Sequence, residues 1–373
     1  MAQLAAAAVV LSRLAPGRHR TPPLRPRALP AEAVGAEGAP AVSVVVPARN
    51  EAGRIGPCLD ALMADTQVGE VLVVDDESTD ATAEVAAAAG ATVVPGRPLP
   101  PGWVGKQWAL WQGVRAATGI WVVTLDADAM PEPGLAGALV ASALEHGFDL
   151  LSVGPRFTCD SPGEQLLHPS MLATLAYRFG PPGPTARPGP ARVLANGQCM
   201  AFRRELLADG HAFSAISGNL TDDVALARWL ARDGRLVGFM DGAELLTVRM
   251  HTSVGETWRE WGRSLALPDV TSPAWQAPDL AVVWLTMGLP PLRLASGRGT
   301  AVDAALVALR VALTGALAGS YARPRPWVWL SPAADPATAA RLTLSALRPA
   351  RTWRGRTYAP PTRPGRSAAR PGS

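Results

Sequence analysis

The feature that most constrains the fold of this chain is an alternation of short apolar runs with helical stretches between residues 41 and 125. The runs 41–46, 70–74 and 121–125 are rich in valine, and stretches with helical periodicity lie between them. Regular alternation of this kind predicts a parallel sheet covered by helices, because two parallel neighbours need a long crossover connection. The sequence therefore predicts an α/β domain with a mostly parallel central sheet and flanking helices.

Acidic residues follow two of these apolar runs directly. Asp76 comes just after the second run, and Asp126 and Asp128 come just after the run that ends at Leu125. Alternate residues of an extended chain lie on one side, so the carboxylates of Asp126 and Asp128 can converge on one cation. Such oxygen ligands favour Mg2+ or Mn2+, although an acidic turn would look the same in sequence. Ligands of open parallel sheets bind at this carboxyl edge.

The loop after the first run offers groups that suit a nucleotide base. In the segment VVVPARNE the strand ends at Pro47, and Arg49, Asn50 and Glu51 follow. Asp76, at the end of the next run, can accept a hydrogen bond from the imide N–H of a uracil ring. The neighbouring Ser78, Thr79 and Asp80 are also suited to capping the next helix, and the two roles are compatible.

Composition and charge narrow the class of protein. With 373 residues, of which 48% are hydrophobic, the chain can bury one large or two ordinary cores. The net charge is only +4, and arginines gather near both ends. These ends have no aromatic residues regularly spaced among the arginines and no recognisable nucleic-acid-binding motif, so we expect no nucleic-acid partner. Cys58, Cys159 and Cys199 have neither zinc nor disulfide-framework spacing, which fits a reducing compartment.

Several apolar stretches indicate contact with a membrane. Residues 4–14 are too few to cross a bilayer core of about 30 Å. Residues 280–289 are short, and residues 301–317 contain Asp303 and Arg310, which are costly at mid-bilayer. The sequence therefore predicts a membrane-associated region and leaves the number of spans open.

The motifs taken together resemble the family 2 glycosyltransferases. This resemblance rests on the order of VVVPARNE, VVDDESTD, a Gly-Lys pair before a helix, and LDADAM. The segments PPGWVGKQWAL, ANGQCMAFRRE, TDDVALARWL, VRMHTSVGETWREW and TWRGRTY resemble the branch that glycosylates carotenoid acids, together with hopanoid-associated enzymes. The resemblance covers roughly residues 42–358 and implies a GT-A fold and a UDP-sugar donor.

The resemblance also implies a division of the chain and a donor site. We expect a leader at 1–40, a GT-A catalytic domain at 41–268, apolar membrane-associated helices at 269–330 and a basic tail at 331–373. The residues expected to bind the donor are Pro47, Arg49, Asn50, Glu51, Asp76, Lys106 and Asp126. Lys106 would act as a point charge on phosphate. The residues expected to hold the metal are Asp126, Asp128 and His251.

The resemblance implies that the catalytic residue lies in the Asp222-Asp223 pair of TDDVALARWL. Asp223 is the expected base, and Thr221 or Asp222 is expected to cap the helix that follows. The acceptor-binding candidates are Asn196, Gln198, Asp222, Trp258 and Trp261. Trp258, Arg259 and Trp261 do not match the spacing of the Q-x-x-R-W element, which argues against a processive polymer synthase.

The expected activity is an inverting, metal-dependent transfer of a sugar from a UDP-sugar to an isoprenoid lipid such as a carotenoid acid. Glucose is the expected sugar, and the expected place is the cell membrane with the catalytic domain facing the cytoplasm. Alternatives are transfer to a hopanoid or polyprenyl lipid, and a nucleotide- or lipid-binding protein without turnover. A nucleotidyltransferase is disfavoured because PARNE stands where a glycine-rich phosphate loop is expected.

Overall fold

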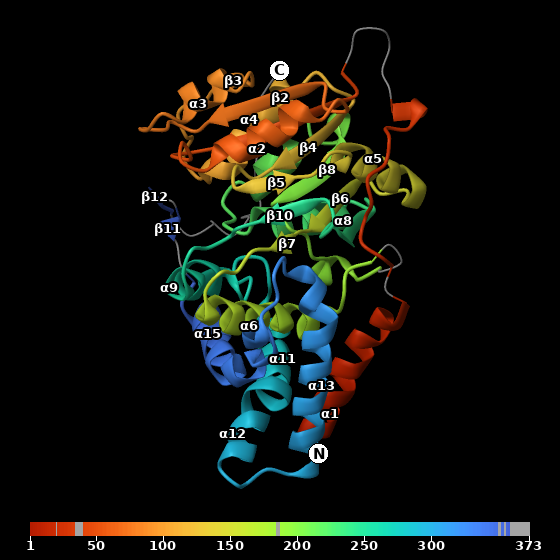
Figure 1. Ribbon diagram of the computed structural model, residues 1–373, viewed down its shortest axis with the longest axis vertical. Coiled ribbons are helices and arrows are strands. Elements are labelled where there is room, and N and C mark those ends of the chain that lie inside the picture. The colour runs from red at the N-terminus through yellow and green to blue at the C-terminus, as the bar shows by residue number, and fades with distance from the viewer. Residues whose placement is uncertain (20, 34–39, 184–186, 350–351, 354–355, 359–373) are drawn as a thin grey trace, which may run out of the picture.

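A computed structural model covers the chain and describes residues 1–19, 21–33, 40–183, 187–349, 352–353 and 356–358. Figure 1 shows two stacked parts. The α/β body comprises the sheets with helices α2–α5, α7 and α8. The helical body comprises α1, α6 and α9–α15 and lies below the α/β body in the figure.

The centre of the α/β body is a seven-stranded sheet with the order β3-β2-β1-β4-β8-β6-β9. Strand β8 is antiparallel to both of its neighbours, and the other pairings are parallel. The strands are β1 (Val42–Ala48), β2 (Glu70–Asp75), β3 (Thr92–Pro95), β4 (Trp121–Leu125), β6 (Leu150–Gly154), β8 (Cys199–Arg203) and β9 (Val237–Asp241). The predicted α/β class with a mostly parallel central sheet is confirmed.

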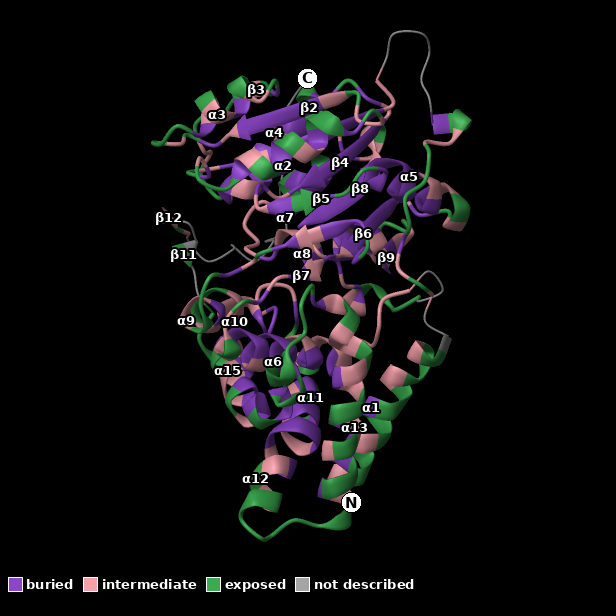
Figure 2. Ribbon diagram, viewed as in Figure 1, coloured by how far each residue is buried: buried purple, intermediate pink, exposed green. Residues whose placement is uncertain are grey.

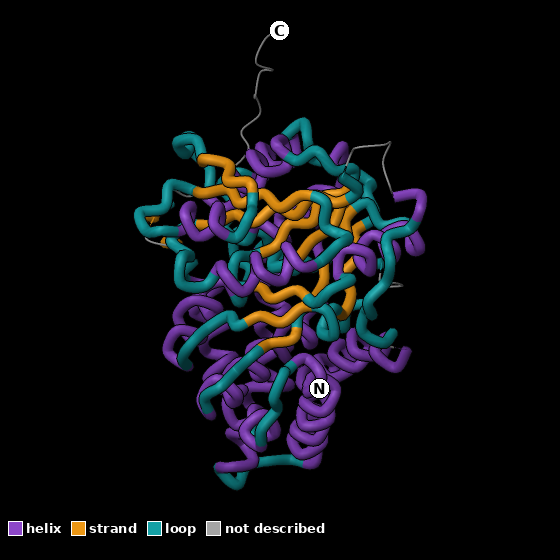
Figure 3. The backbone as a smooth tube through the Cα atoms, turned by 45° about the horizontal axis from the view of Figure 1, so that its top comes forward, coloured by secondary structure: helices purple, strands orange, loops and turns teal. Residues whose placement is uncertain are grey.

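Helices cover both faces of this sheet, as the tube in Figure 3 shows. They are α2 (Ile55–Ala64), α3 (Thr82–Ala88), α4 (Gly105–Ala116), α5 (Leu135–His146), α7 (His211–Ile216) and α8 (Asp222–Arg232). Along β1, Val44 and Val46 belong to one apolar cluster and Val45 belongs to the cluster on the opposite face. Burial on both faces explains why the strand reads as a continuous apolar run.

Two small sheets complete the strands. In the first, β10 (Leu246–Val248) pairs antiparallel with β5 (Ala129–Pro131) and parallel with β7 (Arg156–Phe157). It lies between the main sheet and the helical body in Figure 1. The second is a hairpin of β11 (Thr352–Trp353) and β12 (Arg356–Thr357), which we call the C-terminal hairpin.

The helical body packs the first helix of the chain together with helices from the middle and the later part of the sequence. Its members are α1 (Ala2–Leu14), α6 (Pro162–Phe179), α9 (Val254–Glu256), α10 (Gly262–Ser264), α11 (Pro273–Val283), α12 (Leu289–Ala295), α13 (Ala301–Leu317), α14 (Pro326–Trp329) and α15 (Asp335–Leu347). A third apolar cluster joins α1, α6, α11 and α15. Short 3-10 or π turns are Ala15–His19, Ala31–Ala33, Pro190–Arg192, Arg204–Leu206, Thr257–Trp261, Trp284–Gly288, Ala318–Ser320 and Ser331–Ala334.

A buried ion network also joins these helices. Asp279 on α11 lies within ion-pair distance of Arg13, Arg178 and Arg192, at 3.2, 3.6 and 2.7 Å. On α13, Arg310 is buried and its Nε lies 3.0 Å from Asp335. By length and composition, the described helical segment Ala301–Ser320 is long and apolar enough to cross a membrane.

The structure differs from the sequence-based expectations in two places. The apolar run that follows Arg192, at residues 193–195, predicts a strand from the sequence, but Arg192 ends a 3-10 turn, its guanidinium binds Asp279, and the strand begins only at Cys199. The expected basic tail at 331–373 contains α15, whose Ala339 and Leu342 are buried in the helical body. The described residues do not include residues 359–373 of that tail. They also do not include residues 184–186 of the proline-rich loop at 181–190.

Candidate active site

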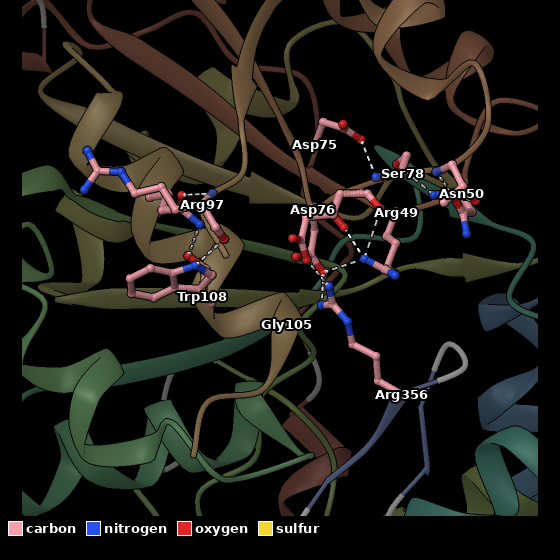
Figure 4. A network of polar contacts seen from close by, with 12 residues as sticks. Arg49, Asn50, Asp75, Asp76, Ser78, Arg97, Gly105, Trp108 and Arg356 are labelled. Atoms are coloured by element: carbon pink, nitrogen blue, oxygen red, sulfur yellow. Dashed lines mark hydrogen bonds and ion pairs between the residues drawn. The ribbon is translucent and has the colours of Figure 1, made fainter. Parts of the chain in front are cut away.

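The carboxyl ends of β1 and β2 place a buried carboxylate between two arginines (Figure 4). Asp76 Oδ2 lies 2.7 Å from Arg356 Nη1 and 4.0 Å from Arg49 Nη1. Burial raises the pKa of Asp76, and the two guanidinium groups act in the opposite direction. A small pocket of about 70 Å³ adjoins this carboxylate. Its lining includes the predicted metal residue Asp128 and the predicted donor residues Pro47, Arg49, Glu51, Asp76, Lys106 and Asp126.

Asn50 has a different position from the one expected. Its Oδ1 accepts hydrogen bonds from the backbone and hydroxyl of Thr79, and its backbone N–H donates to Ser78 Oγ. Asn50 and Glu77 both adopt positive φ, at 55° and 54°. Arg49 donates to the carbonyls of Asp76 and Glu77 from the same side. Among the described residues, Asn50 is not part of the pocket lining, so it holds the two loops together instead of facing the donor.

Lys106 lies at the meeting point of two acidic groups. Its Nζ is 2.7 Å from Asp126 Oδ1 and 3.9 Å from Asp222 Oδ2. Burial would lower the pKa of Lys106, but Asp126 and Asp222 outweigh it and the net shift is upward. The ammonium therefore stays charged and links the Asp-x-Asp segment to the start of α8.

The metal-site prediction is only partly consistent with the structure. Burial, with Asp126 and Glu51 adding to it, raises the pKa of Asp128 to about 6. This excess of negative charge on oxygen ligands suits a hard divalent cation. Among the described residues, however, no three His, Cys, Asp or Glu side chains are arranged to hold a metal ion. His251 lines the same large cavity as the two aspartates but does not form such a group with them. Its Nδ1 lies 4.0 Å from Glu256 Oε1, and burial lowers the pKa of His251.

The first turn of α8 carries the predicted base. Asp223 accepts hydrogen bonds from the backbone N–H groups of Gly197 and Val224, at 2.8 and 2.7 Å. Burial, followed by the neighbouring charge of Asp222, raises the pKa of Asp223 to about 7. Asp222 Oδ2 is buried and accepts no hydrogen bond within the described structure. Thr221 holds the N-cap position, but its hydroxyl donates to Asp269 and caps nothing.

The turn before β8 presents two acceptor-binding candidates. Asn196 and Gln198 bind each other through two hydrogen bonds, from Asn196 Nδ2 to Gln198 Oε1 and from the Gln198 backbone N–H to Asn196 Oδ1. Ser152 fixes the backbone of Asn196 at both its N–H and its carbonyl. This turn is therefore rigid where it faces the carboxylate of Asp223.

A cavity of about 1190 Å³ connects these groups to the helical body. Its polar end is lined by Lys106, Asp126, Asp128, Asn196, Gln198, Asp222, Asp223 and His251. Its other end is apolar and is lined by Leu14, Leu172, Leu175, Ala176, Leu309, Ala312, Leu313 and Leu317. Most of these apolar residues lie on α6 and α13, so the two bodies share one cavity.

Of the two tryptophans expected at the acceptor, the structure places only one on this cavity. Trp261 lines the cavity and stacks against the buried ring of His168, with ring centroids 4.4 Å apart. Trp258 does not belong to the described lining. It packs with the third apolar cluster, and the guanidinium of Arg341 lies 5.8 Å from its ring.

Sequence reasoning missed two arginines of the site. Arg54 lines the cavity and pairs with Glu51 at 3.0 Å, on the far side of the loop that begins at Pro47. Arg356 reaches Asp76 across 280 positions of sequence. The signal for Arg356 was present in the TWRGRTY segment, but that pattern alone does not indicate which pocket the hairpin enters.

The mostly parallel sheet, with Asp76, Asp126 and Asp128 at its carboxyl edge, gives the α/β body a GT-A-like fold. Residues 43–210 match the family described as Glycosyl transferase family 2.

Individual relatives match either a shorter part of the chain or a longer part at lower sequence identity. The 4,4'-diaponeurosporenoate glycosyltransferase of Staphylococcus aureus (strain USA300) is 42% identical over 89 residues, which cover 24% of this chain and 24% of that protein. The chain thus matches about a quarter of the length of these curated relatives. The structure of Mycobacterium tuberculosis glucosyl-3-phosphoglycerate synthase with Mn2+ and UDP-glucose is 26% identical and covers 66% of this chain and 86% of that chain, with a TM-score of 0.42.

Proposed function

We propose that this protein transfers a sugar from a UDP-sugar to an isoprenoid lipid at the cytoplasmic face of the cell membrane, with inversion at the anomeric carbon. The observation that carries the proposal is the shared cavity, because it joins an acidic, polar end to an apolar end in one volume of about 1190 Å³. Ligand pockets usually measure about 300–1,000 Å³, so this one has room for a sugar and a long hydrocarbon together.

The donor side supports a nucleoside diphosphate. Asp76 offers an acceptor for an imide N–H, and Lys106 supplies a fixed positive charge near Asp126. Asp126 and Asp128 would hold Mg2+ or Mn2+, and the diphosphate oxygens would complete the coordination, as is usual for Mg2+ in phosphate sites. When bound, such an ion stabilises the negative charge of the leaving diphosphate. The family match over residues 43–210 and the short match to a 4,4'-diaponeurosporenoate glycosyltransferase support the same reading.

The acceptor side supports proton removal by Asp223. The carboxylate lines the cavity, is fixed by two backbone N–H groups, and has a pKa of about 7. A base with a pKa near the working pH is the most effective for general-base catalysis. With a lipid hydroxyl, Asp223 takes the proton as the oxygen attacks the anomeric carbon. With a carboxylic acid, which is already ionised, Asp223 only orients the attacking oxygen.

The apolar end supports a lipid acceptor. Leucine and alanine side chains from α6 and α13 form its wall and offer an apolar surface to a hydrocarbon chain. A carotenoid acid, a hopanoid and a polyprenyl lipid all have a long apolar body and one polar end. We propose a carotenoid acid because the curated match is to a diaponeurosporenoate glycosyltransferase, and we propose glucose because the resemblance in sequence implies it.

The membrane assignment rests on the surface of the helical body. Figure 2 shows exposed residues at the lower ends of α1, α12 and α13. The large exposed apolar side chains of this body include Leu4, Val9, Leu11, Trp275, Leu292, Leu294, Val311, Trp327, Trp329, Leu330, Leu344 and Leu347. Exposed apolar groups in this number mark an interaction surface, and tryptophans suit the interface between lipid and water.

The test measures UDP release by the purified full-length protein in detergent with Mn2+. UDP-glucose, UDP-galactose and UDP-GlcNAc are supplied separately, with and without a carotenoid-acid extract, a hopanoid or a polyprenol. We expect release from UDP-glucose to rise only with a lipid acceptor and to be lost in Asp223→Asn. Stimulation by the hopanoid or polyprenol would reassign the acceptor. UDP binding without release from any donor would identify a binding protein and overturn the proposal.

A further inference from the structure

We infer that the lipid acceptor enters the cavity sideways from the bilayer, through an opening between the N-terminal segment and the C-terminal half of α13. We call it the lateral opening, and its rim is formed by Leu14, Arg18, Ala312 and Ala316. The inference rests on the proposed function, since it presupposes a lipid acceptor. It adds a route of entry and assigns the face of the helical body that lies against lipid.

The polarity of α13 is the reverse of that of a helix on a surface in water. Its charged residues, Asp303 and Arg310, are both buried, and Arg310 pairs with Asp335. Surface helices in water turn charged residues outward, whereas helices in lipid turn them inward and pair them. The segment Ala301–Ser320 has 20 residues and measures about 30 Å, which matches a hydrocarbon core. The exposed residues of α13 are all apolar: Ala301, Ala304, Ala305, Ala308, Val311, Ala312 and Ala316.

Helix α1 has the same reversed polarity. Gln3 turns inward and its Nε2 donates to Asp303 Oδ1 at 2.7 Å, and Arg13 turns inward to pair with Asp279. The one exposed polar side chain, Ser12, donates its hydroxyl to a backbone carbonyl of the same helix. The exposed residues of α1 are Ala2, Leu4, Ala5, Ala8, Val9, Leu11 and Ser12. The exposed faces of α1 and α13 therefore suit contact with hydrocarbon.

The apolar end of the cavity opens on this surface. Ala312 and Ala316 are exposed and also line the cavity, so the cavity reaches the outside of α13 there. Leu14 lines the same end from α1. The hydrogen bond between Gln3 and Asp303 joins the first turns of the two helices, which lie away from the α/β body in Figure 1. The lateral opening thus lies along the later turns, nearer to the α/β body.

The cavity also reaches the surface at a second, polar opening. Thr252, Ser253 and Arg259 are exposed and line the cavity there. A long hydrocarbon would have to cross water to enter by this route, at a cost that grows with every methylene group. Through the lateral opening the chain keeps apolar contacts while its polar end moves toward Asp223. Exposed Arg18 at the rim suits the level of the anionic lipid headgroups.

The first experiment tests which medium covers α13. The variants Ala308→Cys, Ala312→Cys and, as a control, Ala88→Cys carry a disulfide-linked nitroxide label on the full-length protein in phospholipid vesicles. The native Cys58, Cys159 and Cys199 are buried, and Ala88 is exposed on α3 of the α/β body. We expect both labels on α13 to collide more with oxygen than with a water-soluble nickel complex, and the label on α3 to do the reverse. A preference for nickel on α13 would overturn the inference. Shielding from both reagents, by a protein partner or a second copy of this chain, would also overturn it.

The second experiment tests the route of entry. The label on Ala312→Cys lies at the rim, whereas the label on Ala308→Cys lies on the same helix outside the described lining. At Ala312→Cys we expect the label to lower UDP release with a long isoprenoid acceptor in the vesicles by about fivefold or more. Release with a short, water-soluble analogue should change less than about twofold, because that analogue can use the polar opening. A reductant that removes the label should restore the rate, and the label on Ala308→Cys should change neither rate.

The outcomes separate this inference from the proposed function. Equal loss with both acceptors, or no loss in labelled Ala312→Cys, would mean that the lipid reaches Asp223 by another route. Either result would overturn the inference and leave the proposed function intact. Absence of lipid-dependent UDP release by the unlabelled protein would overturn the proposed function and the inference together.

Discussion

The donor pocket lies among the ends of β1, β2 and β4, whereas the acceptor end of the cavity lies between α6 and α13 of the helical body. The donor pocket measures about 70 Å³ and is lined by arginine, lysine and carboxylate groups. The large cavity measures about 1190 Å³ and becomes apolar away from the acidic groups. The small pocket therefore offers closely spaced polar contacts to a ligand, and the apolar end of the large cavity offers space for a long apolar group.

This difference follows from how each end is constructed. Residues at strand ends are held by neighbouring ladder hydrogen bonds, and so their side chains can be placed precisely. The helices of the other end are held together by an apolar cluster and by buried ion pairs such as Arg310 with Asp335. Selectivity for the base should therefore depend on single atoms, and selectivity for the lipid should depend mainly on length and width.

The largest expected effect comes from the base at the junction of the two ends. Replacing Asp223 by Asn should lower the acceptor-dependent rate by about 10²–10⁴-fold, because the proton of the acceptor hydroxyl loses its recipient. UDP binding should stay within about twofold, since Asp223 does not line the donor pocket. Both quantities are measured on one preparation, by UDP release and by calorimetry. Parallel loss of donor binding would contradict the separation of the two ends.

The next effect concerns the attachment of the helical body. In Asp279→Asn, buried Arg178 and the neighbouring Arg13 and Arg192 lose their shared carboxylate. Removing one partner of a buried charge pair costs about 3–5 kcal/mol in the free energy of unfolding. Urea unfolding followed by tryptophan fluorescence measures this loss.

The matched control for that experiment is Asp233→Asn. Its carboxylate is 56% exposed and pairs with Arg235 on the surface, so the expected cost is below about 1 kcal/mol. Equal stability of the two variants would show that the ion network does not hold the helical body in place.

A smaller effect is expected from pH. Because the folded pKa of Asp223 is raised to about 7, the base is ionised above that pH and becomes protonated as the pH falls through it. With a hydroxyl acceptor, kcat/KM should fall by about tenfold per unit below pH 7 and should be flat above it. A carboxylic acid acceptor should remove this dependence near pH 7. A midpoint near 4 with the hydroxyl acceptor would contradict the assignment.

The donor end was the more predictable part from sequence. The convergence of Asp76, Asp126 and Asp128 on one pocket could be predicted because each follows an apolar strand, and strand ends of a parallel sheet meet at one edge. Lys106 was assigned to the same site, although its ion pair with Asp126 was not foreseen. The local sequence pattern is sufficient here, because the residues that follow neighbouring parallel strands lie close together at one edge of the sheet.

The acceptor end could not be predicted in the same way. The contact between α6 and α13, the position of Trp258 and the approach of Arg356 to Asp76 all depend on packing between distant segments. His251 was expected to join the metal ligands, but a single histidine carries no information about which wall of a cavity it will occupy. The type of side chain at these positions limits the chemical role that it can have, but it does not determine where the side chain lies in the folded protein.

The most direct test of the shared cavity is to narrow its apolar end. Ala312 on α13 lines this end, and Ala305 on the same helix is exposed and lies outside the described lining. In Ala312→Trp we expect kcat/KM for a long isoprenoid acceptor to fall at least tenfold, while a short, water-soluble analogue changes less than about twofold. Ala305→Trp should change neither. Equal effects on both acceptors would contradict the claim that the lipid body occupies this cavity.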